Sequence, residues 1–145
     1  SDIKPAFINH TLPIQKGLLM FSDNGQFLLF TESDIFSPKT ARLKKVSSYE
    51  CDSSIQPVDL GTSVLFTSNV SAYARAFEAT ILDDDTPPQI LEQTRVVPEF
   101  LPKNITCIII STIILDKDEN SQRGIHGRLR VLCNTWLIQV VISLL

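Results

Sequence analysis

The side chains that could carry out chemistry are few, and they stand far apart in the sequence. The chain of 145 residues has two histidines, His10 and His126, and neither lies in a recognisable catalytic motif. A hydrolase or transferase needs a nucleophile beside a base, or two carboxylates that face each other in a cleft. His10 lies in a segment that we expect to be a loop. Surface or structurally satisfied histidines are therefore the simpler interpretation.

One acidic cluster, Asp83–Asp85, stands beside two prolines, and carboxylates of this kind can ligate a hard cation such as calcium. The EF-hand spacing, with its central glycine and distal glutamate, is absent from the sequence. Glycine-rich phosphate loops and the GxSxG and HExxH motifs are absent too. We therefore expect a solvated turn at 83–85, and a protein that is not an enzyme and has no catalytic residue, metal site or cofactor.

Basic residues gather at two points, one formed by Arg42, Lys44 and Lys45 and the other by Arg128 and Arg130. Neither point is interleaved with aromatic residues, as a face that binds single-stranded nucleic acid would be. The formal net charge of −3 gives no general attraction to nucleic acid. We interpret both points as solvated strand faces.

The cysteines and the hydropathy indicate the kind of environment. Cys51, Cys107 and Cys133 fit no CxxC or zinc-ribbon spacing, so we expect reduced thiols that act as small buried apolar groups. Residues 129–145 are apolar, but polar residues interrupt the run and it is short for a membrane span. No membrane partner is therefore expected.

The segments that position these residues read as strands, because the apolar runs are short and rich in β-branched and aromatic residues. In residues 17–30, two such runs flank Asp23-Asn24-Gly25. Asn24-Gly25 supplies the positive φ values of a type I′ turn, which predicts a β-hairpin. Residues 61–69 and 72–79 predict a second hairpin, with a short helix over 71–82 as the alternative.

The remaining segments complete an all-β prediction. A strand is expected over 41–48, continuing through Tyr49 and Cys51 until Pro57 breaks the chain. An extended, proline-punctuated segment is expected over 96–102, a buried strand over 105–115 and a polar turn over 116–122.

Two parts of the sequence echo each other. Leu19–Asn24 aligns with Val64–Asn69 at an offset of 45 residues, and each part follows a glycine and ends at an asparagine. Strand repeats of this period are typical of propeller blades, although two hairpins can resemble each other without forming a repeat. The predicted fold class is all-β, built of antiparallel hairpins, as part of a β-propeller-like or related β-repeat domain.

Six phrases in order resemble the tail nozzle protein, or tail tubular protein B, of short-tailed podovirus-type bacteriophages. The phrases are Gly17-Leu-Leu with Phe21-Ser22, Gln26–Leu29, Ser37–Ala41, Pro57-Val58 with Leu60–Thr62, Tyr73 with Arg75 and Phe77-Glu78, and Val97-Pro98 with Leu101–Lys103. The resemblance covers about residues 1–106. It divides the chain into a β-rich nozzle-like segment over 1–106 and a divergent or truncated apolar segment over 107–145, in which we also expect strands.

The resemblance implies a structural component of the virion tail. It implies an internal piece of a longer chain, with a propeller-type domain in a homo-hexameric ring beneath the tail adaptor. DNA would pass through the lumen without specific binding, and tail fibre proteins would attach outside. The alternative is a carbohydrate- or protein-binding β-module, in which Tyr49, Tyr73, Phe100 and Trp136 would converge on one face. An enzyme using Asp83–Asp85 and His10, or a membrane-linked protein, is a lesser alternative.

Overall fold

The computed structural model describes residues 5–15, 17–81, 86–96, 98–101, 103, 105–113, 125–133 and 136–144. The strands in these ranges are β1 Ile8–Ile14, β2 Gly17–Ser22, β3 Gly25–Thr31, β4 Ala41–Ser47, β5 Val58–Asp59, β6 Ser63–Ser68, β7 Arg75–Thr80, β8 Gln89–Glu92, β9 Ile105–Ile113, β10 Ile125–Cys133 and β11 Trp136–Leu144. A 3-10 helix, η1, covers Pro98–Phe100. The expectation of an all-β chain is confirmed.

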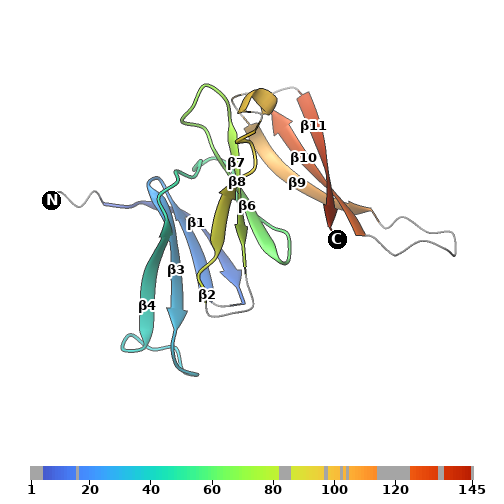
Figure 1. Cartoon of the computed structure of the whole chain (residues 1–145). Helices are drawn as coiled ribbons and strands as arrows, with labels where there is room; N and C mark the ends of the chain where they lie inside the picture. The colour runs from blue at the N-terminus through green and yellow to red at the C-terminus, as the bar shows by residue number, and fades with distance from the viewer. Residues whose placement is uncertain are drawn as a thin grey trace, which may run out of the picture.

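The described strands form three antiparallel sheets, each a meander of consecutive strands. Sheet A has the order β1-β2-β3-β4, sheet B has the order β5-β6-β7-β8, and sheet C has the order β11-β10-β9. Sheets A and B are stacked, and sheet C extends to one side of them (Figure 1). Strand β4 contacts β8 at one edge of the stack, and β5 contacts β9. The sequence predicted antiparallel hairpins in a propeller-like or related β-repeat domain. The described ranges contain the antiparallel hairpins, in two stacked four-stranded sheets, but they do not show a propeller.

The first predicted hairpin is confirmed as β2–β3, but its turn is one residue earlier than expected. Ser22 pairs with Gly25, so Asp23 and Asn24 form the turn and Gly25 begins β3. A glycine is required at position 25 because a Cβ atom on this residue would lie 2.5 Å from the carbonyl oxygen of Ser47, at the end of the neighbouring strand β4. Gly25 thus permits the close approach of β4.

The second hairpin is confirmed as β6–β7, so the strand prediction holds over the helical alternative for 71–82. The echoed residues meet in space: the rings of Phe21 and Phe66 have centroids 5.1 Å apart. Leu19 and Val64 are fully buried in the same cluster. The two copies of the echo therefore face each other across the A–B interface, and they supply the same residue types to one shared core.

Two predictions around sheet A were wrong. The segment around His10 is the edge strand β1 and not a loop, and Pro13 is compatible with this place because an edge strand leaves backbone groups unpaired. Strand β4 ends at Ser47 and does not continue through Cys51. The chain leaves the sheet because the buried amide of Gln26 donates to the carbonyl of Tyr49 and the amide of Cys51 donates to Ser22.

The later predictions have mixed outcomes. The segment expected to be extended over 96–102 contains η1, since Pro98 suits the first turn of a helix. The strand predicted from Ile105 is confirmed as β9, and it crosses the expected boundary at residues 106 and 107. The loop 83–85 and the turn 116–122 lie outside the described residues.

Strand β6 of sheet B is buried on both faces, and each of its faces belongs to a separate hydrophobic cluster. The face toward sheet A joins a cluster made of Leu19, Phe21, Cys51, Val64, Phe66, Phe77 and Ala79. The opposite face joins a cluster made of Ile55, Leu65, Ala74, Ala76, Leu101, Ile105 and Ile108. Alternation along β6 explains this, because successive side chains of a strand point to opposite faces.

Four aromatic rings connect the two stacked sheets. Phe66 and Phe77 are cross-strand partners whose rings stack at 5.1 Å, and Phe21 from sheet A contacts Phe66 at the same centroid distance. The ring of Tyr49 lies 4.4 Å from that of Phe77, tilted by 34°. We name this set of rings, Phe21, Phe66, Phe77 and Tyr49, the aromatic stack.

Replacing the central ring of the aromatic stack tests this account of the core. We expect Phe66→Ala to lower the free energy of unfolding by about 3–5 kcal/mol, because it removes a fully buried ring and leaves a cavity between the sheets. Urea unfolding followed by circular dichroism measures the change. Val96→Ala, at a side chain that is 90% exposed, should stay within about 0.5 kcal/mol of the parent chain. Equal effects of the two substitutions would contradict the assigned core.

Candidate functional site

The histidines and the acidic cluster do not form a catalytic site in the described part of the chain. His10 lies on β1 opposite Phe21, and its Nε2 atom is buried without a hydrogen-bond partner. Within the described ranges, no group of three or more His, Cys, Asp or Glu side chains could hold a metal ion. Asp83–Asp85 lies outside those ranges, and of His126 only the strand position in β10 is described.

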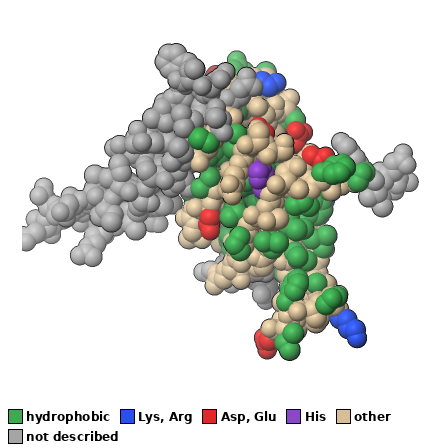
Figure 2. Space-filling view, turned by 180° about the vertical axis from the view of Figure 1, so that it is seen from behind, with side chains coloured by type: hydrophobic (Ala, Val, Ile, Leu, Met, Phe, Trp, Pro, Cys, Tyr) green, Lys and Arg blue, Asp and Glu red, His purple; other side chains and the backbone are tan. Residues whose placement is uncertain are grey.

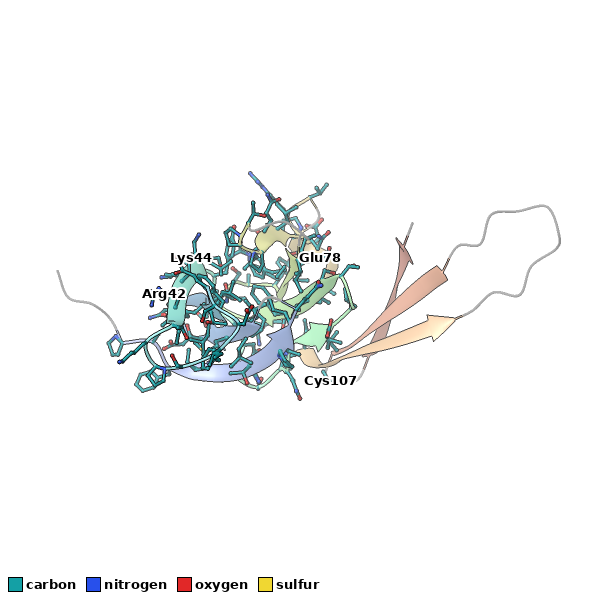
Figure 3. All side chains as sticks on the ribbon, turned by 90° about the horizontal axis from the view of Figure 1, so that it is seen from below. Arg42, Lys44, Glu78 and Cys107 are labelled. Carbon is teal, nitrogen blue, oxygen red and sulfur yellow. The ribbon has the colours of Figure 1, made fainter. Side chains whose placement is uncertain are left out.

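The basic side chains of β4 are solvated, as predicted, although Lys45 lies on the opposite face of the strand from Arg42 and Lys44. Arg42, Lys44 and Lys45 are all exposed, and Figure 3 shows Arg42 and Lys44 projecting from the β4 edge of the molecule. The Nε atom of Arg42 lies 3.6 Å from a carboxylate oxygen of Glu32, and both side chains are at least half exposed. The Nζ atom of Lys45 lies 5.9 Å from the ring of Phe27. Such exposed pairs contribute little to stability.

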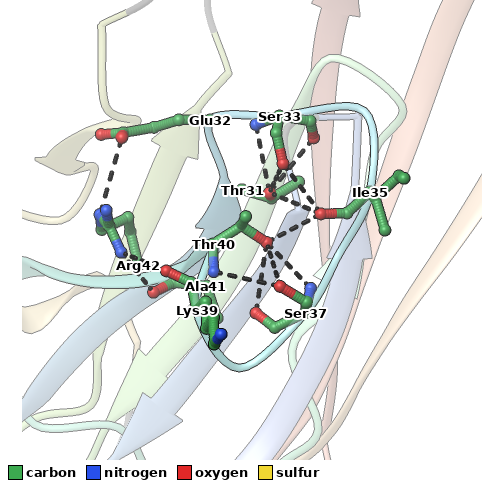
Figure 4. Close-up of polar contacts among 9 residues, drawn as sticks. All are labelled: Thr31, Glu32, Ser33, Ile35, Ser37, Lys39, Thr40, Ala41 and Arg42. Carbon is green, nitrogen blue, oxygen red and sulfur yellow. Dashed lines mark hydrogen bonds and ion pairs between the residues drawn. The ribbon is translucent and has the colours of Figure 1, made fainter.

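The connection between β3 and β4 is held by its own polar groups. The hydroxyl of Thr40 donates to the carbonyl of Ile35 at 2.8 Å, and the amide of Ser37 donates to that hydroxyl at 2.9 Å (Figure 4). The hydroxyl of Thr31 accepts from the amide of Ser33 at 3.2 Å. Local bonds of this kind fix a turn. This loop therefore positions β4 and carries no ligand chemistry of its own.

An open groove of about 1030 Å³ lies beside this loop. Its lining includes Phe30, Phe36 and Lys44 on the side of sheet A, and Thr86 and Pro87 before β8. Among the residues that the structure describes, its lining holds no histidine, cysteine or aspartate. The groove therefore offers mainly apolar contact, and its one described carboxylate, Glu32, is paired with Arg42.

Cys51 is a structural thiol, as expected. It is 2% exposed, and burial, together with the charges of Asp52 and Glu50, raises its pKa to about 12. A thiol with so high a pKa is almost wholly protonated at neutral pH and is a poor nucleophile. Cys107 is a free, half-buried thiol, and Cys133 is placed only by its backbone on β10.

The aromatic residues proposed for a binding face do not act together where their side chains are described. Tyr49 belongs to the aromatic stack, and Tyr73 lies in the β6–β7 connection with 45% of its surface exposed. Phe100 is placed only as part of η1 and Trp136 as the first residue of β11. Core packing therefore accounts for Tyr49, and the carbohydrate-binding alternative gains no convergent face.

An ion pair that sequence reasoning missed joins β7 to β8. Arg75 donates from Nε and a terminal nitrogen to the two carboxylate oxygens of Glu92, at 2.9 and 2.5 Å. The guanidinium of Arg75 also lies 5.0 Å from the ring centre of Phe77. The hydrogen bonds from Arg75 hold the pKa of Glu92 below its usual range. Only the strand register brings these residues, 17 apart in sequence, into contact, so no local pattern could have predicted the pair.

Residues 136–144 form strand β11, where the sequence had suggested a membrane-linked segment as a lesser alternative. A helix long and apolar enough to span a bilayer is not found among the residues that the structure describes.

The geometry thus defines an all-β protein with stacked sheets, an internal aromatic core and solvated edges. The chain belongs to the bacteriophage nozzle protein family, whose model matches residues 1–114. It is also similar to the tail tubular protein gp12 of Escherichia phage T7, with 25% identity over 104 residues. That alignment covers 71% of this chain but only 13% of the length of the T7 protein.

Family membership settles the class of protein. The family is a structural, non-enzymatic one of the phage tail, so the chain is a component of the virion tail. The resemblance predicted from the ordered phrases is therefore confirmed, and so is the expectation that the protein is not an enzyme.

The contribution of the Arg75–Glu92 pair can be measured through its pH dependence. The pKa of Glu92 is depressed in the folded state, so its stabilisation is present above the unfolded pKa and is lost as the pH falls through the folded pKa. We expect Glu92→Gln to lower the free energy of unfolding by about 1 kcal/mol at pH 7, after allowing for solvent screening. The deficit relative to the parent chain should shrink progressively in acid, as urea titrations at a series of pH values would record.

The matched control is Glu32→Gln, which breaks the exposed pair with Arg42. Its effect should be close to zero at every pH, because exposed pairs are screened by water and salt. A pH-independent effect of Glu92→Gln would show that packing, and not charge, explains the role of Glu92.

The raised pKa of Cys51 predicts low reactivity. At pH 8 the thiolate population should be roughly three orders of magnitude smaller in the folded chain than in the unfolded chain. Iodoacetamide labelling followed by peptide mass spectrometry should therefore modify Cys51 only after urea is added. The half-buried Cys107 serves as the internal comparison and should react earlier. Rapid labelling of Cys51 in the native chain would contradict its burial.

Proposed function

We propose that this chain forms part of the wall of a homo-hexameric ring in the tail nozzle. The observation that carries the proposal is the family match over residues 1–114. The stacked sheets suit a wall, because the inner strand β6 is buried on both faces and packed β-layers deform little. Copies of such a chain can close a ring by cyclic symmetry.

We further infer that DNA leaves through the lumen of this ring without specific binding. The net charge of −3 supports passage without adhesion, because a conduit that gripped phosphates would need a strongly basic lining. The basic residues whose side chains are described on β4 occupy an edge strand. The tail adaptor above the ring and tail fibre proteins on its outside are the partners that the family resemblance implies.

The order of the strands supports a radial repeat of the propeller type in the longer protein. Each meander runs from one edge of its sheet to the other, and β4 contacts β8 while β5 contacts β9. The first strands of sheets B and C are therefore in contact, and so are the fourth strands of sheets A and B. Neighbouring blades of a propeller are related in this way. In this proposal residues 1–106 form the nozzle-like unit, and residues 107–145 begin a more divergent one.

The test is the assembly state of the chain within its flanking phage sequence. We expect the purified protein to form rings with a central channel, seen by negative-stain electron microscopy, and to sediment as a hexamer. A well-behaved monomer at every concentration tested, with no ring in the micrographs, would overturn the proposed role in assembly.

A further inference from the structure

Strand β4 is an edge strand of sheet A, and among the described residues it pairs only with β3. In an antiparallel sheet, successive residues of a strand direct their backbone groups alternately to its two sides. Counted from the hairpin turn between Ser22 and Gly25, the backbone of Lys44 faces β3, so Leu43 and Lys45 direct their N–H and C=O groups to the open side. Strand β4 therefore offers a template on which a further strand can form.

The open groove lies beside this edge. Its lining includes Lys44 of β4, Phe30 of β3 and Phe36 of the β3–β4 connection, with Pro87 before β8 as a further wall. Its volume of about 1030 Å³ lies at the upper end of the range of roughly 300–1,000 Å³ that is typical of ligand sites. Alternate side chains of a strand added to β4 would point into this groove. We name the backbone edge of 43–45, together with the groove beside it, the β4 docking edge.

The β3–β4 connection holds apolar side chains in place at this site. The side chains of Ile35 and Phe36 are 74% and 60% exposed, although the hydroxyl of Thr40 binds the carbonyl of Ile35 and fixes the backbone there. Hydrophobic side chains gather at the lower end of the surface in Figure 2, where this connection lies. Apolar groups on a fixed backbone lose little freedom when a partner binds, so the docking edge is preorganised for contact.

The charges of the β4 docking edge define the partner that would fit it. Within the described ranges Arg42 pairs with Glu32, and no carboxylate pairs with Lys44 or Lys45. These two lysines point to opposite faces of β4, so consecutive residues of an added strand would lie opposite them. Opposite charges at such cross-strand positions stabilise a sheet, and like charges destabilise it. A strand with two consecutive carboxylates is therefore the complement of this edge.

A second copy of the chain does not supply this complement through its described edge strands. Besides β4, the edge strands of the three sheets are β1, β5, β8, β9 and β11. They contain one carboxylate each in β5 and β8, Asp59 and Glu92, and none in the other three. Glu92 is already bonded to Arg75. A β4 strand placed on β4 would bring lysines together instead.

Sheet A also does not need a fifth strand from its own polypeptide. Sheets A and B are both four-stranded meanders, which is the size of a complete propeller blade. A strand connected covalently to the sheet reaches it at a high effective concentration, without selection by charge. A strand from a separate protein is selected among competitors by complementary charge. The basic edge therefore favours a separate protein.

We propose that the β4 docking edge receives an acidic, extended segment of a different tail protein, which adds a strand to β4. The backbone of the segment pairs with Leu43 and Lys45. Consecutive carboxylates of the segment face Lys44 and Lys45, and its apolar side chains enter the groove over Phe30 and Phe36. The inference deepens the proposed nozzle role and rests on it for the presence of other tail proteins.

Hydrogen exchange of single backbone amides tests whether the edge is covered. In the free full-length protein the amide of Leu43 should exchange rapidly, because it faces the open side of β4. In purified phage tails we expect its exchange to slow at least tenfold, because the amide then bonds to the added strand. The amide of Lys44, which faces β3, is the internal reference and should exchange slowly in both states. Mass spectrometry with fragmentation between neighbouring residues measures both rates.

Photo-crosslinking identifies the occupant. Leu43→p-benzoylphenylalanine places a reactive group on a side chain that is 61% exposed. In purified tails we expect it to crosslink to a segment of a different tail protein that carries two consecutive carboxylates, as peptide mass spectrometry would show. Lys44→Glu should lower the crosslinked fraction at least tenfold, and Lys44→Gln should lower it less. Lys103→Glu, the same change of charge at an exposed residue outside sheet A, is the matched control and should leave the fraction unchanged. Circular dichroism of each variant checks that its fold is kept.

Several results would overturn the inference. A crosslink to the nozzle chain itself, to DNA, or to a segment without carboxylates would assign the edge to another occupant. Equal exchange of the Leu43 amide in free protein and in tails would show that the edge stays empty. Rings in the micrographs with an unprotected edge would reject this inference alone, whereas absence of the chain from purified tails would reject the nozzle role as well.

Discussion

The fold depends on the contact between two aromatic side chains from separate sheets, Phe21 and Phe66. Phe21 lies on β2 and Phe66 on β6, each an inner strand of its own four-stranded meander, and their ring centroids are 5.1 Å apart. Phe77 and Tyr49 extend the contact across sheet B and onto the connecting segment. Aromatic rings bury large areas in defined relative orientations, so this one column of rings accounts for much of the cohesion between the sheets.

The segment that connects sheet A to sheet B is held by hydrogen bonds to both sheets. Gln26 is fully buried, yet its amide is satisfied by the carbonyl of Tyr49 and by the hydroxyl of Ser47. The amide of Asp52 then donates to Thr67 on sheet B. Buried polar groups that find partners specify one geometry, because the same groups left unpaired would be costly. The crossing between sheets is therefore a defined element and not a loose linker.

Local patterns in the sequence were enough to predict strands and hairpins but not their edges or their partners. The β2–β3 and β6–β7 hairpins were predictable because their apolar runs and turn residues are adjacent in the chain. Strand β1 was missed because Pro13 and the polar residues around it resemble a loop when the neighbouring strand is not considered. The Arg75–Glu92 pair depends on register between strands, which single-sequence periodicity does not contain.

The two edge strands of sheet A carry features that oppose pairing between molecules. Pro13 removes a hydrogen-bond donor from β1, and Arg42, Lys44 and Lys45 place positive charge along β4. Both devices discourage strand-by-strand growth between molecules, which is the route to cross-β fibres. The margins of sheet A therefore oppose edge-to-edge pairing of separate molecules even at high local concentration.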